Sequence, residues 1–225
     1  MIFSPSSRSR LMQTDELIAF FRYLNSHSCY LILRNWEDLF DDSNAGASQH
    51  EDIDVLCDDL LAFVSLTGAK PVHGEKNRDN YVIPIGTDLI RFDIRSVGDG
   101  YYPEPWEKRM LERRILSDNG VFVMHPEDYY FSLLYHALLQ KPSVSNEYLS
   151  RLKQLSHSLG NERISKENLF IASLKTFLSD HRYKVEIPRD PGVYLQWATM
   201  RKMGYQMSLR RLAERLLFKV RKKIA

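Results

Sequence analysis

The stretch Glu51-Asp52-Ile53-Asp54-Val55-Leu56 decides how this 225-residue chain is expected to fold. Its alternation of acidic and apolar residues predicts a strand, and side chains two positions apart on a strand point to the same face. Asp52 and Asp54 therefore share one face. Asp93 lies within a later apolar run that predicts a second strand, Leu89-Ile90-Arg91-Phe92-Asp93-Ile94. We expect the three carboxylates to converge.

Three carboxylates within apolar strands require a compensating partner. Asp is depleted from strands, and like charges on one face repel each other. Mg²⁺ takes oxygen ligands, commonly one or two carboxylates together with substrate phosphates. Asp52, Asp54 and Asp93 are therefore predicted Mg²⁺ ligands in a site for phosphoryl or nucleotidyl transfer. The alternative is that Asp52 ends a loop, Asp54 faces solvent and Asp93 pairs with Arg91 or Arg95.

The composition indicates a folded chain in a reducing compartment. Hydrophobic residues make up 44% of the chain and aromatic residues 12%, which is enough to build a core. The two cysteines, Cys29 and Cys57, lack the spacing of a metal site or a disulfide framework. No run approaches the roughly 18 apolar residues of a membrane span. We therefore expect a soluble cytoplasmic protein.

Positive charge gathers at the C-terminus, although the formal net charge is only +2. Residues 201–225 contain nine Lys or Arg and one acid. Apolar positions at helical spacing predict that 205–224 form a basic amphipathic helix. Such a helix can bind an anionic membrane surface, which would place the protein peripherally at the membrane, or a nucleic-acid backbone. It can equally be an ordinary surface helix.

Strands are expected mainly in the first half of the chain and helices throughout. Helical spacing and end signals predict helices at 14–27, 58–68, 106–116, 126–140, 147–158, 165–179 and 193–200. Apolar runs bounded by turns predict strands at 30–33, 53–57, 69–73, 80–85 and 88–97, with 121–124 extended.

This order of elements predicts the α+β class, with a mixed sheet flanked by helices and followed by an α-helical C-terminal region. The expected organisation is a flexible N-terminal arm at 1–13, an α/β domain at 14–102 and a helical domain at 103–225 that ends in the basic helix.

The N-terminal half resembles the nucleotidyltransferase superfamily, the DNA polymerase beta-like fold. The matching features are a leading helix, the strand Tyr30 to Leu33, the pair Asp52 and Asp54 opening the next strand, and Asp93 in a later strand. The resemblance implies two Mg²⁺ ions held by the three aspartates, with Asp93 also acting as base for an acceptor hydroxyl. It further implies a nucleoside triphosphate or nucleotide-activated donor and a small-molecule or glycan-type acceptor.

One motif departs from this resemblance. Family members usually carry Gly-Gly or Gly-Ser after the first strand, where the backbone approaches the triphosphate, whereas this chain has Arg34-Asn35-Trp36. Arg34 and Asn35 are predicted to bind substrate there, because a guanidinium can hold phosphate oxygens in a bidentate manner. The alternative is that Arg34 pairs with Glu37 or Asp38 on the surface.

Further basic residues are candidates for substrate binding. Arg91 and Arg95 flank Asp93 on the same strand face, where they could bind substrate phosphates or neutralise the aspartates. Lys76 lies in a polar turn and is either a phosphate contact or an ordinary solvated residue. His136, by contrast, is expected as a hydrogen-bonded residue at the edge of the core.

The expected function is magnesium-dependent nucleotidyl or phosphoryl transfer through the three aspartates. One alternative is a catalytically silent domain of the same fold that binds a nucleotide, a membrane or a protein, which the missing Gly-Ser motif favours. A third is a nucleic-acid-directed nucleotidyltransferase that uses the basic helix. The sequence identifies neither the nucleotide base, the acceptor nor the oligomeric state.

Overall fold

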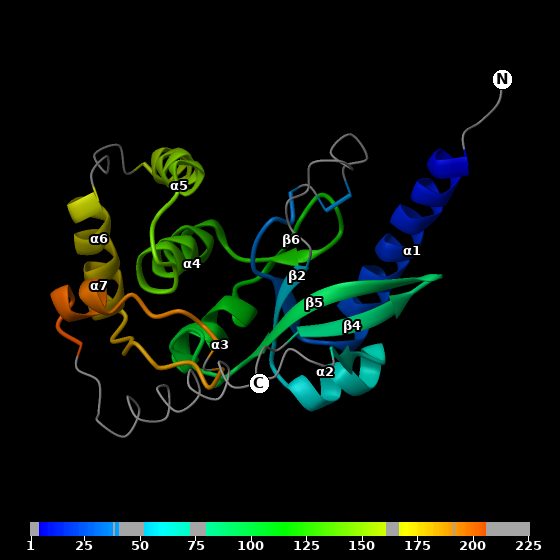
Figure 1. The fold of residues 1–225 in the computed structure, drawn as a ribbon, viewed down its shortest axis with the longest axis horizontal. Helices are drawn as coiled ribbons and strands as arrows, with labels where there is room; N and C mark the ends of the chain where they lie inside the picture. Colours follow the sequence, from blue (N-terminus) through cyan, green and yellow to red (C-terminus); the bar gives the residue numbers. More distant parts are fainter. Residues whose placement is uncertain are drawn as a thin grey trace, which may run out of the picture. The chain divides into compact units, whose positions relative to one another are not determined.

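The computed structural model describes residues 5–37, 39–40, 52–72, 80–160, 167–190 and 192–205. Over these residues the chain has a mixed seven-stranded sheet and seven helices (Figure 1), which confirms the predicted α+β class. None of the described helices is both long and apolar enough to cross a membrane. The predicted basic helix after Tyr205 and the turn that holds Lys76 lie outside the described residues.

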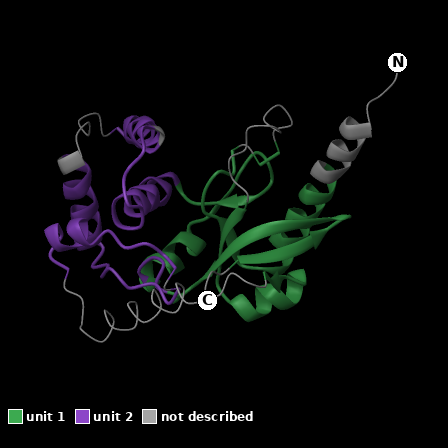
Figure 2. Ribbon diagram, in the orientation of Figure 1, with its two compact units in different colours: residues 1–99, 104–125 green, residues 100–103, 126–225 purple. Residues whose placement is uncertain are grey.

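The chain forms two compact units (Figure 2). Unit 1 comprises residues 1–99 and 104–125, and unit 2 comprises residues 100–103 and 126–225. Unit 1 contains the whole sheet and helices α1 (Pro5–His27), α2 (Leu60–Thr67) and α3 (Glu104–Glu112). Unit 2 contains helices α4 (Pro126–Leu139), α5 (Asn146–Ser158), α6 (Glu167–Asp180) and α7 (Trp197–Lys202).

The sheet places strands β2 and β5 at its centre. The strands are β1 (Tyr30–Ile32), β2 (Ile53–Cys57), β3 (Lys70–Pro71), β4 (Asn80–Ile85), β5 (Asp88–Ser96), β6 (Ile115–Leu116) and β7 (Phe122–Val123). Their order is β3-β4-β5-β2-β1-β7-β6. β2 runs parallel to β5 and β1 parallel to β7, whereas the other neighbours are antiparallel. Both central strands are therefore hydrogen-bonded on two sides, which holds their side chains in a defined register.

One face of the sheet carries the main apolar core of unit 1. Val55 of β2 and Phe92 of β5 point into it, and Phe21 of α1 and Phe63 of α2 pack there with them. Because side chains alternate along a strand, the neighbours of Val55 and Phe92 in sequence must emerge on the opposite face. Asp54 and Asp93 are those neighbours. Burial of the apolar set thus determines the face on which the carboxylates lie.

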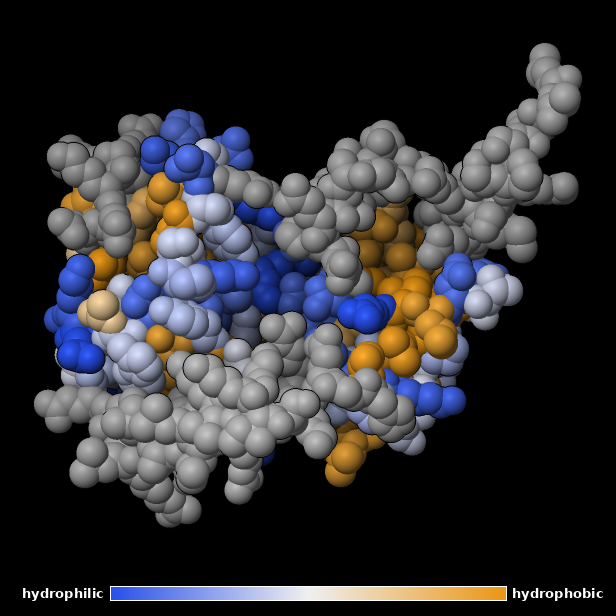
Figure 3. All heavy atoms as spheres, in the orientation of Figure 1, coloured by the Kyte–Doolittle hydropathy of each residue, from blue (hydrophilic) through white to orange (hydrophobic). Residues whose placement is uncertain are grey.

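The β4–β5 hairpin contributes Ile83, Ile85, Phe92 and Ile94 to this core but also carries exposed residues. Asp88 and Leu89 are exposed at the start of β5, and Figure 3 shows hydrophobic residues on the surface over these two strands. Burial increases along β5, so that Arg91 is exposed, Asp93 is partly buried and Arg95 is buried. The polar residues of one strand face therefore run from the surface into the protein.

Helix α1 begins earlier than predicted. The expected flexible arm at 1–13 is helical from Pro5 onward, and Thr14 lies inside the helix rather than at its start. Proline is compatible with the first turn of a helix, since its missing N–H has no intrahelical partner there. Residues 6–13 contain neither glycine nor a second proline that would stop the helix.

The sheet also takes in residues that were expected to be helical. The predicted helix 106–116 ends at Glu112, and Ile115 and Leu116 form the edge strand β6, which pairs with β7 around a turn closed by Gly120 at φ 77°. Two-residue strands are too short to show a period-two pattern. Unit 1 therefore includes residues 104–125, whereas the sequence analysis ended the α/β domain at residue 102.

The faces of α2 provide a test of this arrangement. Phe63 is 1% exposed in the core, whereas Leu61 on the same helix is 80% exposed. Phe63→Ala should lower the free energy of unfolding by about 3–5 kcal/mol, because it leaves a cavity, and Leu61→Ala should change it by less than about 0.5 kcal/mol. Urea unfolding followed by circular dichroism measures both. Equal effects of the two substitutions would contradict the placement of α2.

Candidate functional site

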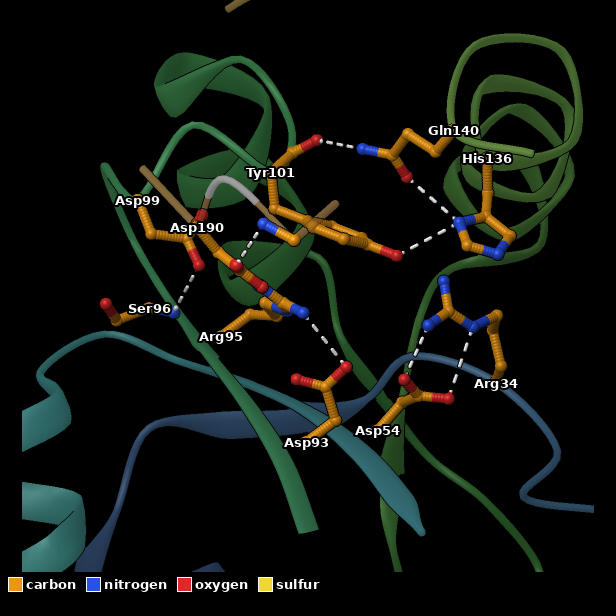
Figure 4. Close-up of polar contacts among 11 residues, drawn as sticks. Arg34, Asp54, Asp93, Arg95, Ser96, Asp99, Tyr101, His136, Gln140 and Asp190 are labelled. Atoms are coloured by element: carbon orange, nitrogen blue, oxygen red, sulfur yellow. Dashed lines mark hydrogen bonds and ion pairs between the residues drawn. The ribbon is translucent and has the colours of Figure 1, made fainter. Parts of the chain in front are cut away.

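The candidate site lies where β2 and β5 run side by side. Asp54 is directly opposite Asp93 in the parallel pairing of these strands. Figure 4 shows both carboxylates rising from the two strands toward arginine side chains. Like charges directly opposite each other on a sheet are destabilising. The pair therefore needs positive charge beside it.

Arg34 supplies positive charge to Asp54. The N–H of Leu33 donates to the carbonyl oxygen of Asp54 at 2.8 Å, which continues the pairing of β1 and β2 up to this point. Nε of Arg34 donates to Oδ2 of Asp54 at 3.2 Å, and Nη2 donates to Oδ1 at 2.5 Å. The side chains of Arg34 and Asp54 are 8% and 13% exposed. This bidentate ion pair is therefore largely removed from water, and Asp54 does not face solvent.

The chain turns immediately after Arg34. Asn35 has φ 56°, in the left-handed region that asparagine adopts more readily than most other residues with a side chain. Trp36 then packs against the apolar core of unit 1. Where the resemblance predicts glycine, Asn35 therefore has a backbone conformation typical of glycine. The residue before it, Arg34, has a buried guanidinium.

Arg95 supplies positive charge to Asp93. Its Nη2 donates to Oδ2 of Asp93 at 3.0 Å, and the two side chains are 6% and 16% exposed. The predicted alternative that Asp93 pairs with Arg95 is therefore confirmed. The other carboxylate oxygen of Asp93, Oδ1, is buried and has no hydrogen-bond partner among the residues that the structure describes. A buried acceptor without a partner is unfavourable, so this oxygen is available to a cation or a donor group.

Burial also changes the acidity of Asp93. Loss of hydration raises the pKa of Asp93 from its ordinary 3.8 to about 6. The positive charge of Arg95 opposes this increase, and the neighbouring carboxylate of Asp54 adds to it. Asp93 can therefore take up or release a proton close to neutral pH, as a general base must.

The other predicted residues lie around this centre or outside the described residues. Asp52 is partly buried just before β2, and Arg91 is exposed on β5, two positions before Asp93. Among the residues that the structure describes, no three His, Cys, Asp or Glu side chains come close enough to hold a metal ion by themselves. The carboxylates that the structure brings face to face are Asp54 and Asp93. Lys76 lies outside the described residues.

Unit 2 contains a separate polar cluster. Nδ1 of His136 lies 2.9 Å from both the Tyr101 hydroxyl and Oε1 of Gln140. Nε2 of Gln140 donates to the carbonyl oxygen of Tyr101 at 2.7 Å, so its Oε1 faces the imidazole ring (Figure 4). Nδ1 therefore carries the proton that Gln140 accepts. His136 is buried and hydrogen-bonded, in agreement with the expectation from the sequence.

The sequence predicts the carboxylates but not the partner of Arg34. The acids near Arg34 in the chain are Glu37 and Asp38, whereas the structure pairs Arg34 with Asp54 on the neighbouring strand. The antiparallel pairing of β1 and β2 is what brings the two together. A signal was present, because Arg34 follows one apolar strand and Asp54 lies within the next.

Comparison of the chain with models of protein families, with curated proteins and with solved structures finds no match in any of the three. The geometry of the site therefore has to support any assignment of function.

The raised pKa of Asp93 predicts a particular pH dependence of stability. Between about pH 4 and pH 6 the folded protein retains a proton that the unfolded chain has released, so this group makes the wild type less stable as pH rises. Asp93→Asn removes that penalty. The free energy of unfolding of the variant minus that of the wild type should thus increase by about 1–3 kcal/mol from pH 4 to pH 7. Urea titrations at several pH values measure this difference.

The matched control is Asp88→Asn, which removes an exposed carboxylate from the same strand. A difference between Asp93→Asn and wild type that does not change with pH would contradict the raised pKa.

Proposed function

We propose that unit 1 is a magnesium-dependent transferase of nucleotidyl or phosphoryl groups, with a nucleotidyltransferase-like fold. The observation that carries the proposal is the in-register pair Asp54 and Asp93 on the two central strands. One oxygen of that pair, Oδ1 of Asp93, is buried and has no hydrogen-bond partner within the described part of the chain. The two carboxylates therefore offer oxygen ligands for a cation, and both are fixed on the central strands β2 and β5.

The residues present fit Mg²⁺. The ion is usually bound in proteins through one or two carboxylates, with phosphate oxygens and water completing an octahedron. Asp54 and Asp93 would hold it. Asp52, the third predicted ligand, does not form a three-carboxylate group with them among the described residues. When bound, Mg²⁺ would neutralise charge on the phosphates and polarise the phosphoryl oxygen that it contacts. The resemblance implies two such ions.

The arginines supply a second part of the chemistry. Arg34 and Arg95 are buried beside the carboxylates, so their charges act in surroundings of low polarity. Charge develops on the phosphoryl oxygens during transfer, and positioned guanidinium groups stabilise it. Arg91, exposed further along the same strand face, is placed to contact a substrate phosphate at the surface.

Asp93 is proposed to accept the proton of the acceptor hydroxyl. In the protein without a metal ion, burial raises the pKa of this carboxylate to about 6, which makes it a stronger base than an exposed aspartate. A bound Mg²⁺ would lower that pKa. The donor would be a nucleoside triphosphate or a nucleotide-activated compound, and the acceptor a small molecule or a glycan. The helical unit 2 is the candidate for acceptor selection.

A second candidate function is favoured by the two ion pairs. Both carboxylates are already neutralised by buried arginines. Such an arrangement can be stable without a metal ion, as expected of a catalytically silent domain that binds a nucleotide or another partner. The two functions differ in whether ligand binding requires Mg²⁺.

Asp54→Asn tests the proposed function. Turnover that depends on Mg²⁺ should be lost, because a neutral amide is a poor Mg²⁺ ligand. The circular dichroism spectrum should remain that of the wild type, while the melting temperature should fall, because the buried Arg34 loses the charge of its carboxylate partner. The assay uses a panel of nucleoside triphosphates and nucleotide sugars, with and without Mg²⁺, read by thermal shift, calorimetry and product formation.

Asp88→Asn is again the matched control and should behave as the wild type, since Asp88 is exposed at the hairpin end of β5. Full Mg²⁺-dependent activity of Asp54→Asn would exclude the metal role of Asp54. Binding of a nucleotide by the wild type without any effect of Mg²⁺ would support the silent domain instead.

A further inference from the structure

Arg34 is hydrogen-bonded to Asp54, one of the two carboxylates that would bind the proposed metal ion. Its guanidinium donates to both oxygens of Asp54. Arg95 is different, because it donates to Oδ2 of Asp93, while Oδ1 has no hydrogen-bond partner among the described residues. A cation could therefore bind Asp93 with Arg95 in place, whereas at Asp54 it must compete with Arg34.

Displacement of Arg34 from Asp54 has an energetic consequence. Its side chain is only 8% exposed, and a buried charge that gives up a bidentate carboxylate partner loses a strong interaction. A phosphate group can replace that carboxylate, since its oxygens match the planar fork of arginine in the same way.

The position of Arg34 in the chain favours this second partner. Arg34 follows β1 and precedes the left-handed turn at Asn35, and Trp36 anchors the far side of that turn in the core. The backbone on both sides of Arg34 is thus held by β1 and by the core. A change of partner would require movement of the side chain alone.

We propose that Arg34 is a phosphate clamp that cation binding releases. In the free protein it neutralises Asp54, and when Mg²⁺ binds Asp54 its N–H donors pass to a phosphate of the substrate. This inference rests on the proposed function and makes its ligand more specific: the site takes a polyphosphate together with Mg²⁺, and each increases the affinity for the other.

The experiment measures binding rather than turnover. Wild type, Arg34→Gln and Arg34→Lys are titrated by calorimetry with MgCl₂ alone, with inorganic tripolyphosphate alone and with tripolyphosphate at saturating Mg²⁺. Arg34→Gln should bind Mg²⁺ alone more tightly than the wild type, because Asp54 is no longer occupied. It should bind tripolyphosphate with Mg²⁺ about 10- to 100-fold more weakly, the loss expected for hydrogen bonds to a charged group.

Arg34→Lys retains the charge but lacks the planar fork, so it should fold as the wild type and still bind tripolyphosphate less tightly. It also keeps the test decisive if Arg34→Gln proves unstable. Arg22→Gln is the matched control, since it removes an exposed arginine of α1 and should leave all three titrations unchanged.

Tighter binding of Mg²⁺ alone by Arg34→Gln, together with weaker binding of tripolyphosphate in the presence of Mg²⁺, would support the clamp. Weaker binding of Mg²⁺ alone by Arg34→Gln, or unchanged binding of tripolyphosphate with Mg²⁺ by both variants, would overturn it. Failure of the proposed function would differ, because the wild type itself would then bind neither Mg²⁺ nor tripolyphosphate with Mg²⁺. That result would overturn both proposals, whereas wild-type binding with the wrong response to substitution would overturn only the clamp.

Discussion

The structure of unit 1 depends on how two like charges are held opposite each other in the middle of a sheet. Asp54 and Asp93 cannot move apart, because Val55 and Phe92 beside them are buried in the core on the other face. A slip of one residue in either strand would turn a carboxylate into that core. At neutral pH, repulsion between the aspartates is therefore relieved mainly by cations on their own face.

The two arginines relieve this repulsion in different ways, and the difference connects structure to function. Arg34 donates to both oxygens of Asp54, whereas Arg95 donates to one oxygen of Asp93, and the other has no hydrogen-bond partner in the described ranges of the chain. The centre is thus neutral as a whole but has one open acceptor. In such a site, a bound divalent ion and a bound polyphosphate would each offset part of the charge of the other.

Local patterns in the sequence predicted much of this arrangement. Period-two alternation identified β2 and β5 and placed Asp54 and Asp93 on strand faces, because that pattern depends only on neighbouring residues. The pairing of Arg34 with Asp54 was not predictable in this way, since it depends on the register between β1 and β2. Strand β6 was missed because two residues carry no periodicity, and the start of α1 was missed because Thr14 resembles a helix cap.

The most direct measurement is a crystal structure of the protein with Mn²⁺, a stand-in for Mg²⁺ with anomalous scattering, and tripolyphosphate. We expect an anomalous peak for Mn²⁺ within coordination distance of the carboxylates of Asp54 and Asp93, with the guanidinium of Arg34 bound to a phosphate. A structure at saturating Mn²⁺ with no such peak, and with Asp54 and Asp93 still paired with Arg34 and Arg95, would contradict the proposed metal site.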